Sequence, residues 1–203
     1  MRHLKDGVFS TDGFIADCRA ALQSGAPGLA IREIARRAVS DPTAVVRALG
    51  PPARAGLVPL YQSAELTILN VVWAPGMSIF PHDHRMWAVI AVYDGREDNA
   101  LFERKAGGLI ATGEKHLNAG DAVLLGARTV HAVTNSLARP TGALQIYGGD
   151  FFKVARRSEF DPATLEERPF DIERAKAVFS HGQRDAARLS SSALRQQRLR
   201  RAA

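Results

Sequence analysis

Residues 56–157 contain a series of short apolar runs that are rich in β-branched and aromatic residues, with turn-forming residues between them. No segment with a helical period separates these runs, which argues against parallel pairing through helical crossovers. Many short strands at nearly even spacing are typical of an antiparallel sandwich or barrel. We therefore predict an all-β jelly-roll barrel over this region. The runs are LTILNVVW (66–73), WAVIAVY (87–93), ALFER (100–104), AVLLG (122–126), HAVTN (131–135) and ALQIYGGDFF (143–152).

The regions on either side of the barrel segment have the periodicity of helices. Residues 1–55 place apolar side chains at helical spacing, and Gly50-Pro51-Pro52 ends this helical N-terminal segment. Residues 158–203 are predicted to form a helical C-terminal segment with a basic tail. Asp161-Pro162 and Asp171 have the residue types of helix N-termini and are expected to begin its helices.

The composition is that of a globular chain, with 46% apolar and 24% charged residues. It excludes a largely disordered chain, a collagen and a coiled coil, and the sequence lacks an uninterrupted apolar run long enough for a spanning helix. The single cysteine, Cys18, can form neither an internal disulfide nor a paired-cysteine zinc site. We therefore expect a cytoplasmic protein without a membrane partner. The oligomeric state stays open, and a homodimer is one of the alternatives.

The net charge of +6 is concentrated at one end of the chain. Residues 184–203 contain six arginines and one acidic residue, which leaves the rest of the chain nearly neutral. A basic tail can bind phosphates, so a nucleic-acid-binding module is one functional hypothesis. A solvated terminus explains the same charge, and we expect no nucleic-acid partner.

The most informative residues are two histidines in the tripeptide His82-Asp83-His84. Alternate residues of a strand point to the same face, so both imidazoles can face the interior of the barrel while Asp83 points away. Imidazole nitrogen is a ligand for iron, zinc, copper and nickel. The alternative is a pair of surface histidines near a turn.

The residues around this tripeptide form a motif in two parts. Gly76 precedes His82 with the spacing G-x5-H-x-H, and Gly120-x10-His131-x3-Asn135 follows downstream. Together with Gly95, these positions resemble the paired motif of the cupin superfamily, whose first half is G-x5-H-x-H-x3/4-E-x6-G and whose second half is G-x5-P-x-G-x2-H-x3-N. The resemblance implies a cupin barrel, or double-stranded β-helix, with a metal held by His82, His84 and His131.

One position departs from the cupin motif in a chemically important way. The carboxylate ligand of the first half would fall on Ala88, which cannot bind a metal, and Glu97 reaches the metal only if the strand register slips. Three neutral histidines then remain as ligands. Because none of them is anionic, a divalent ion keeps its full charge and favours anionic co-ligands such as a thiolate.

Among cupins, the chain resembles the cysteine dioxygenase-like thiol dioxygenases. The shared elements are Trp73-Ala74-Pro75-Gly76, the HDH tripeptide and the stretch from His131 to Asn135. The resemblance implies an Fe(II) cofactor, although nickel, zinc or manganese could take the same ligands. It also implies that the hydroxyl of Tyr147 is directed at bound substrate and oxygen, which makes Tyr147 the candidate catalytic residue.

The substrate-binding residues of that family have weaker counterparts here. Its S-x-H-x-Y strand reads Ala143-Leu144-Gln145-Ile146-Tyr147, so that Gln145 replaces a histidine. The family's substrate arginine on the strand entering the barrel corresponds to Tyr61 and Gln62. Arg85, directly after the tripeptide, is an alternative ligand for a substrate carboxylate, and Arg104 is another.

Two classes of function follow from these observations. The first is an Fe(II)-dependent dioxygenase that oxidises the thiol of cysteine or a mercapto acid to a sulfinate, with the thiol and O2 as its partners. The second is a metal-binding cupin of another class, namely an isomerase, a hydrolase or a small-ligand sensor that has lost the surroundings needed for thiol oxidation. Metal content combined with oxygen uptake distinguishes the two.

Overall fold

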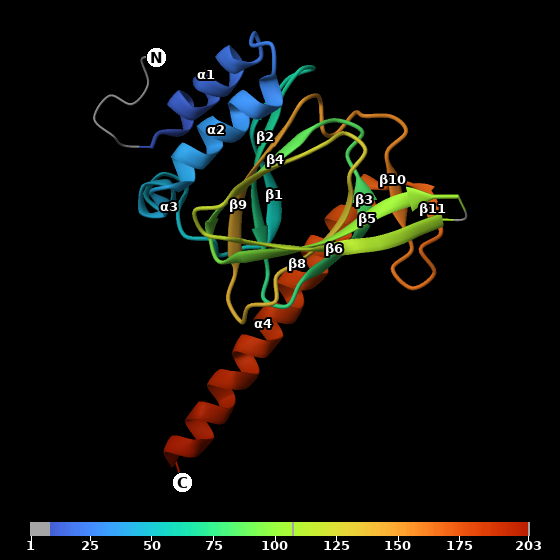
Figure 1. Ribbon diagram of the computed structural model, residues 1–203. Coiled ribbons are helices and arrows are strands. Elements are labelled where there is room, and N and C mark those ends of the chain that lie inside the picture. Colours follow the sequence, from blue (N-terminus) through green and yellow to red (C-terminus); the bar gives the residue numbers. More distant parts are fainter. Residues whose placement is uncertain (1–8, 107, 203) are drawn as a thin grey trace.

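The computed structural model describes residues 9–106 and 108–202, and from residue 188 onward it describes only the backbone of the last helix (Figure 1). Within this part of the chain the strands form two sheets. One sheet has the order β1 (Gly56–Gln62), β2 (Thr67–Trp73), β9 (Thr141–Tyr147), β4 (Ala88–Asp94) and β7 (Ala122–Leu125). The other has the order β11 (Glu167–Pro169), β10 (Ser158–Phe160), β3 (Ser78–Asp83), β8 (Val130–Thr134), β5 (Arg96–Lys105) and β6 (Gly108–Asn118).

The strand pairing is that of a long hairpin rolled into a barrel. Strand β5 pairs with β6, β4 with β7, β3 with β8 and β2 with β9, and all these pairs are antiparallel. Successive strands from β2 to β5 step from one sheet to the other, and so do those from β6 to β9. This is a jelly roll, or double-stranded β-helix, and it confirms the predicted fold class.

The strands of the five-stranded sheet divide their side chains between two apolar clusters. On β9, Ala143 and Tyr147 belong to the cluster inside the barrel, whereas Leu144 and Ile146 belong to a second cluster on the outer face. Helices α1 (Thr11–Ala21), α2 (Pro27–Val39) and α3 (Pro42–Leu49) cover that outer face (Figure 1). Because both faces are covered, the central strands β2, β9 and β4 are almost continuously buried.

The region after residue 157 is helical only in its second part, which corrects the prediction of a helical segment from residue 158. Glu159 of β10 pairs with His82 of β3, so the chain first extends the six-stranded sheet. Asp161 does not begin a helix; its carboxylate accepts hydrogen bonds from the backbone of Ala163 and Thr164 in the turn between β10 and β11. The helix cannot begin before residue 170, because residues 167–169 pair with β10.

The C-terminal helix, α4, extends over Ile172–Ala202 and projects away from the barrel (Figure 1). Asp171 begins it as predicted, since its carboxylate accepts hydrogen bonds from the backbone of Glu173 and Arg174. The first turns pack Ala175 and Phe179 on the interior cluster, with Phe179 4.9 Å from the ring of Trp73. Most arginine side chains of the basic tail lie outside the described residues. None of the helices that the structure describes is long and apolar enough to cross a membrane.

Asn135 of the second motif does not face the histidines, and its hydrogen bonds connect separate segments at one end of the barrel. It is fully buried, and its amide donates hydrogen bonds to the backbone carbonyls of Trp73, Ala74 and Arg139. Its carbonyl oxygen accepts hydrogen bonds from Leu137 and Thr141. This single side chain therefore links the end of β2 to the loop between β8 and β9.

Gly95 of the first motif has a related structural role. Its φ is +80°, which favours glycine, and a Cβ at this position would lie 2.9 Å from the Cα of Thr141. The backbone of β4 and β5 can therefore turn tightly against β9 only because this residue has no side chain.

Replacing Asn135 by Ala should destabilise the protein by about 3 kcal/mol, because several buried backbone groups lose their partners at a typical cost of about 1 kcal/mol each. Denaturant unfolding followed by tryptophan fluorescence measures this change. Asn118→Ala, at an exposed position of β6, is the matched control and should alter stability by less than about 0.5 kcal/mol. Equal stability of the two variants would contradict the structural role of Asn135.

Candidate metal centre

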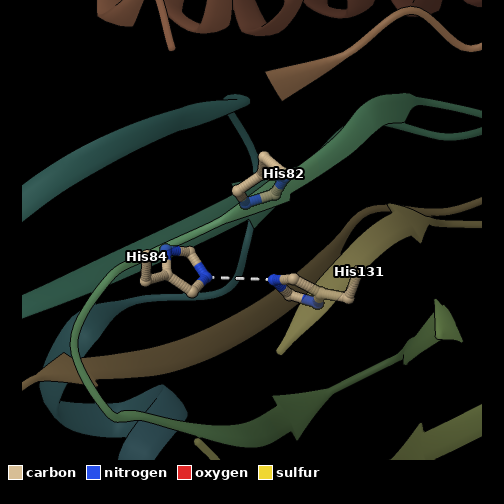
Figure 2. Close-up of side chains that lie close together, drawn as sticks. All are labelled: His82, His84 and His131. Atoms are coloured by element: carbon tan, nitrogen blue, oxygen red, sulfur yellow. Dashed lines mark hydrogen bonds between the residues drawn. The ribbon is translucent and has the colours of Figure 1, made fainter. Parts of the chain in front are cut away.

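Three histidine side chains meet inside the barrel, as Figure 2 shows. His82 on β3 is the direct partner of His131 on β8, and His84 lies just beyond the end of β3. The pairing of β3 and β8 shifts between Ile79 and His82, where Pro81 has no N–H for the ladder. Antiparallel pairing thus brings His82 and His131 together although they are far apart in the chain.

Two of the three imidazoles are held by a hydrogen bond at Nδ1, which leaves Nε2 without a proton. The Nδ1 of His82 lies 3.0 Å from the carbonyl oxygen of Phe80, and the Nδ1 of His131 lies 2.9 Å from the Oδ1 of Asn99. Both partners are acceptors, so the protons of His82 and His131 reside on Nδ1. Their Nε2 atoms therefore carry lone pairs, as in metal sites where a second group orients each histidine, and the lone pair of His131 faces the Nε2 of His84 at 3.0 Å.

The ring nitrogens of His84 and His131 have the spacing of two ligands of one metal ion. One nitrogen from each histidine lies within 4.8 Å of the others, and the Nε2 atoms of His84 and His131 are 3.0 Å apart. Two nitrogens that bind one ion at about 2.1 Å are about 3.0 Å apart when they subtend a right angle. The donor set is therefore that of a candidate site for a divalent transition metal, in which His84 and His131 already have the spacing of two ligands and the third nitrogen has to move inward.

Burial keeps these histidines neutral. All three side chains are almost completely buried, and desolvation lowers the pKa of His82 and His84 well below the ordinary value. Burial, together with the positive charge of Arg157, lowers the pKa of His131 to about 4. Since a metal ion binds only the neutral imidazole, the cluster is ready for ligation at neutral pH.

Arg157 and two phenylalanines form one wall of the site. The guanidinium of Arg157 lies 3.8 Å from the ring of Phe170 and 4.4 Å from the ring of Phe151. Phe170 in turn lies 5.8 Å from the ring of His82. Arg157 is only 5% exposed and donates to the backbone oxygens of Asp83 and Phe151, and no acidic side chain of the described chain forms an ion pair with it. Burial lowers its pKa to about 10.

Tyr147 and Gln145 lie on the inner face of β9, on the side of the histidines. The ring of Tyr147 is 5.0 Å from that of His84, and its hydroxyl donates to the Oε1 of Gln145 at 2.5 Å. Gln145 then donates through Nε2 to Glu97 at 3.2 Å. Glu97 is not part of the histidine group; its carboxylate accepts hydrogen bonds from Trp73 and Gln145.

The other predicted substrate residues lie away from the histidine group, and their binding of a substrate stays a prediction. Tyr61 packs with the outer cluster under the helices, beneath Arg19. Gln62 donates to Asp150 at the surface, and Arg85 pairs with Asp83, the residue that points away from the histidines. Arg104 pairs with the same carboxylate. Gln62 and Arg85 line an open groove of about 740 Å³ between the β1–β2 turn and residues 148–154.

Arg157 is the residue of this site that sequence reasoning missed. It lies at the end of the barrel segment, beyond the last motif, and no spacing links it to the histidines. It reaches them because β10 adds to the edge of the sheet beside β3. The sequence signal is limited to an arginine placed directly before the short pattern Ser158-Glu159-Phe160.

No family model matches the sequence. Solved structures that match part of the chain include a cupin superfamily protein from Desulfitobacterium hafniense, with 20% identity over 48% of this chain and 83% of that chain and a TM-score of 0.39. An RmlC-like cupin family protein from Methanocaldococcus jannaschii has 10% identity over 52% and 88%, with a TM-score of 0.42. The DMSP lyase DddQ from Ruegeria pomeroyi has 21% identity over 54% and 53%, with a TM-score of 0.43.

Replacing His82 by Ala should lower the affinity for a divalent transition metal by more than about 100-fold, because one of three ligands is lost. Asn99→Leu should lower it by about 10- to 100-fold, as expected when a group that orients a ligand is removed. Metal titration of the purified variants measures both changes. His116→Ala is the matched control, since His116 lies on β6 with its side chain 53% exposed. Full metal affinity in the His82 variant would contradict the assignment.

Proposed function

We propose that this protein is an Fe(II)-dependent dioxygenase that oxidises a small thiol carrying a carboxylate, such as cysteine or a mercapto acid, to a sulfinate. The observation that carries the proposal is the buried Arg157 guanidinium beside three neutral histidines. A cation enclosed in this way without an acidic partner is costly unless an anion joins it. The site therefore favours a substrate with negative charge at both ends, a thiolate and a carboxylate.

A bound ferrous ion would supply open coordination positions for a thiolate and for O2, held by His82, His84 and His131. Nickel, zinc or manganese could occupy the same three nitrogens, but iron is the metal suited to oxygen chemistry with this kind of ligand set. Because the ligands are neutral, the full charge of the ion is available to favour the thiolate over the thiol.

The hydrogen bonds of His84 support a role for Arg157 in anion binding. In the structure the Nδ1 of His84 lies 3.5 Å from the Nη2 of Arg157, which can only donate, so the proton of His84 is on Nε2 and points to His131. With a metal ion held by Nε2, the proton of His84 would reside on Nδ1. Arg157 then loses an acceptor, and its Nη2–H is available to a substrate carboxylate.

The remaining walls would exclude water and orient the substrate. Phe151 packs on Tyr147 at 4.4 Å and, with Phe170, encloses the guanidinium of Arg157 between two rings. A dry environment strengthens the hydrogen bond between Arg157 and a carboxylate. The ring of Tyr147 lies 5.0 Å from that of His84 in this wall, and we assign its hydroxyl the role of steering a proton or an oxygen atom by hydrogen bonding.

The test is metal analysis of protein purified without oxygen, followed by oxygen uptake with four thiols: cysteine, mercaptopropionate, mercaptosuccinate and cysteamine. We expect iron-dependent uptake with one or more of the three carboxylate-bearing thiols and much slower uptake with cysteamine, which has no carboxylate. A metal-loaded protein that consumes no oxygen with any of them would favour a metal-binding cupin of another class instead.

Replacing Arg157 by Met should lower kcat/KM for the preferred carboxylate-bearing thiol by about 10- to 100-fold, the loss expected when a hydrogen bond to a charged group is removed. The value for cysteamine should change little, because that substrate makes no such bond. Steady-state oxygen uptake measures both, with metal content and thermal unfolding as checks on folding. Arg139→Met is the control, since Arg139 is exposed and pairs with Asp94. Equal losses with both kinds of substrate would contradict the role of Arg157.

A further inference from the structure

A carboxyl group lies inside the barrel and is not used by the proposed metal site. Glu97 on β5 is 0% exposed. Its Oε1 accepts hydrogen bonds from the indole Nε1 of Trp73 at 2.6 Å and from the Nε2 of Gln145 at 3.2 Å. Its Oε2 is buried and has no hydrogen-bond partner among the described residues. A buried carboxyl with one unpaired oxygen requires an explanation.

When Glu97 is ionised, its charge determines the direction of the two hydrogen bonds that connect it through Gln145 to Tyr147. An ionised carboxylate can only accept, so Gln145 must present its NH2 group to Glu97 and its oxygen to Tyr147. The hydroxyl of Tyr147 then has to donate its single proton to Gln145, as the 2.5 Å contact indicates. With that proton engaged, Tyr147 can offer only lone pairs to a ligand beside the histidines.

Protonation of Glu97 makes the opposite arrangement available. A neutral carboxyl carries an O–H that can donate to the oxygen of Gln145 once the amide has rotated by half a turn. The NH2 group of Gln145 then donates to the oxygen of Tyr147, and the phenolic proton is free to point to the histidines. The added proton has to lie on the oxygen that faces Gln145, which is Oε1 in this structure; a half-turn of the carboxyl group brings the unpaired Oε2 to that place.

We propose that Glu97 and Gln145 form a hydrogen-bond switch that determines whether Tyr147 accepts or donates a hydrogen bond at the three-histidine site. Neutral Glu97 is the state in which Tyr147 donates. Glu97 is therefore a positioning residue that acts on Tyr147 through Gln145. The consequence for catalysis rests on the proposed function, but the switch itself does not.

The charges around the switch are consistent with its operating near neutral pH. Burial raises the pKa of Glu97 to about 7, and the hydrogen bonds from Trp73 and Gln145 oppose this rise only in part. The other titratable and charged groups that face the switch are Tyr147 and Arg157. Burial raises the pKa of Tyr147, so its hydroxyl keeps the proton, and Arg157 stays positively charged with a pKa of about 10.

The switch is tested by carbon NMR of metal-free protein labelled at the glutamate carboxyl carbons and the tyrosine Cζ carbons, between pH 5 and 9. Glu97→Gln and Tyr147→Phe assign the two signals. We expect the Glu97 carbon to titrate near pH 7, about 2 to 3 pH units above an exposed glutamate. The Tyr147 carbon should shift with the same midpoint, because its hydrogen bond changes direction. The histidines stay neutral in this range.

Two variants separate the switch from a merely structural role. In Glu97→Gln, which keeps the shape but cannot titrate, the Tyr147 signal should no longer depend on pH. Glu103→Gln is the matched control on the same strand, 56% exposed, and should leave both signals unchanged. A Tyr147 signal that stays constant while Glu97 titrates would overturn the proposal, and so would a Glu97 midpoint near that of exposed glutamates. Because neither reading needs turnover, failure here is distinguishable from failure of the thiol dioxygenase proposal.

Discussion

The candidate site depends on the register between β3 and β8. His82 and His131 are direct partners in that ladder, so their side chains leave the sheet on the same face at the closest possible spacing. A slip of one residue would turn His82 outward and bring Asp83 into the barrel, which would replace two neutral imidazoles by a buried carboxylate. The shift in pairing at Pro81 and the buried hydrogen bonds of Asn135, at the other end of the β3–β8 ladder, both constrain this register.

The residue between the two histidines has an equally important role on the other face of the sheet. Asp83 is completely buried, and its carboxylate pairs with Arg85 and Arg104 and accepts a hydrogen bond from the backbone of Ser158. That bond holds the start of β10 beside β3. The backbone oxygen of Asp83 also accepts from the Nε of Arg157. The HDH tripeptide thus supplies two candidate ligands and positions the arginine that completes the wall of the site.

Tyr147 is held differently from what the family resemblance implies. A glutamine and a buried carboxyl stand behind its hydroxyl, and Trp73 ties that carboxyl to the opposite sheet. An amide has a donor end and an acceptor end, so it transmits the protonation state of one neighbour to the other. Gln145 and Glu97 therefore support the hydroxyl of Tyr147, and the direction of its hydrogen bond can respond to Glu97.

The sequence by itself determined the fold class, the convergence of the three histidines and the common face of Gln145 and Tyr147. Each of these follows from the two-residue period of a strand and from motif spacing, which are local properties. Tertiary structure alone decided that Arg157 joins the site, that Arg85 and Gln62 remain outside it, and that Glu97 lies behind Tyr147. These outcomes depend on which strands become neighbours: β10 adds to the edge of β3, and β5 faces β2 and β9 across the barrel. Pairing between distant segments is set by the burial of both sheets together, and no local pattern in the chain encodes it.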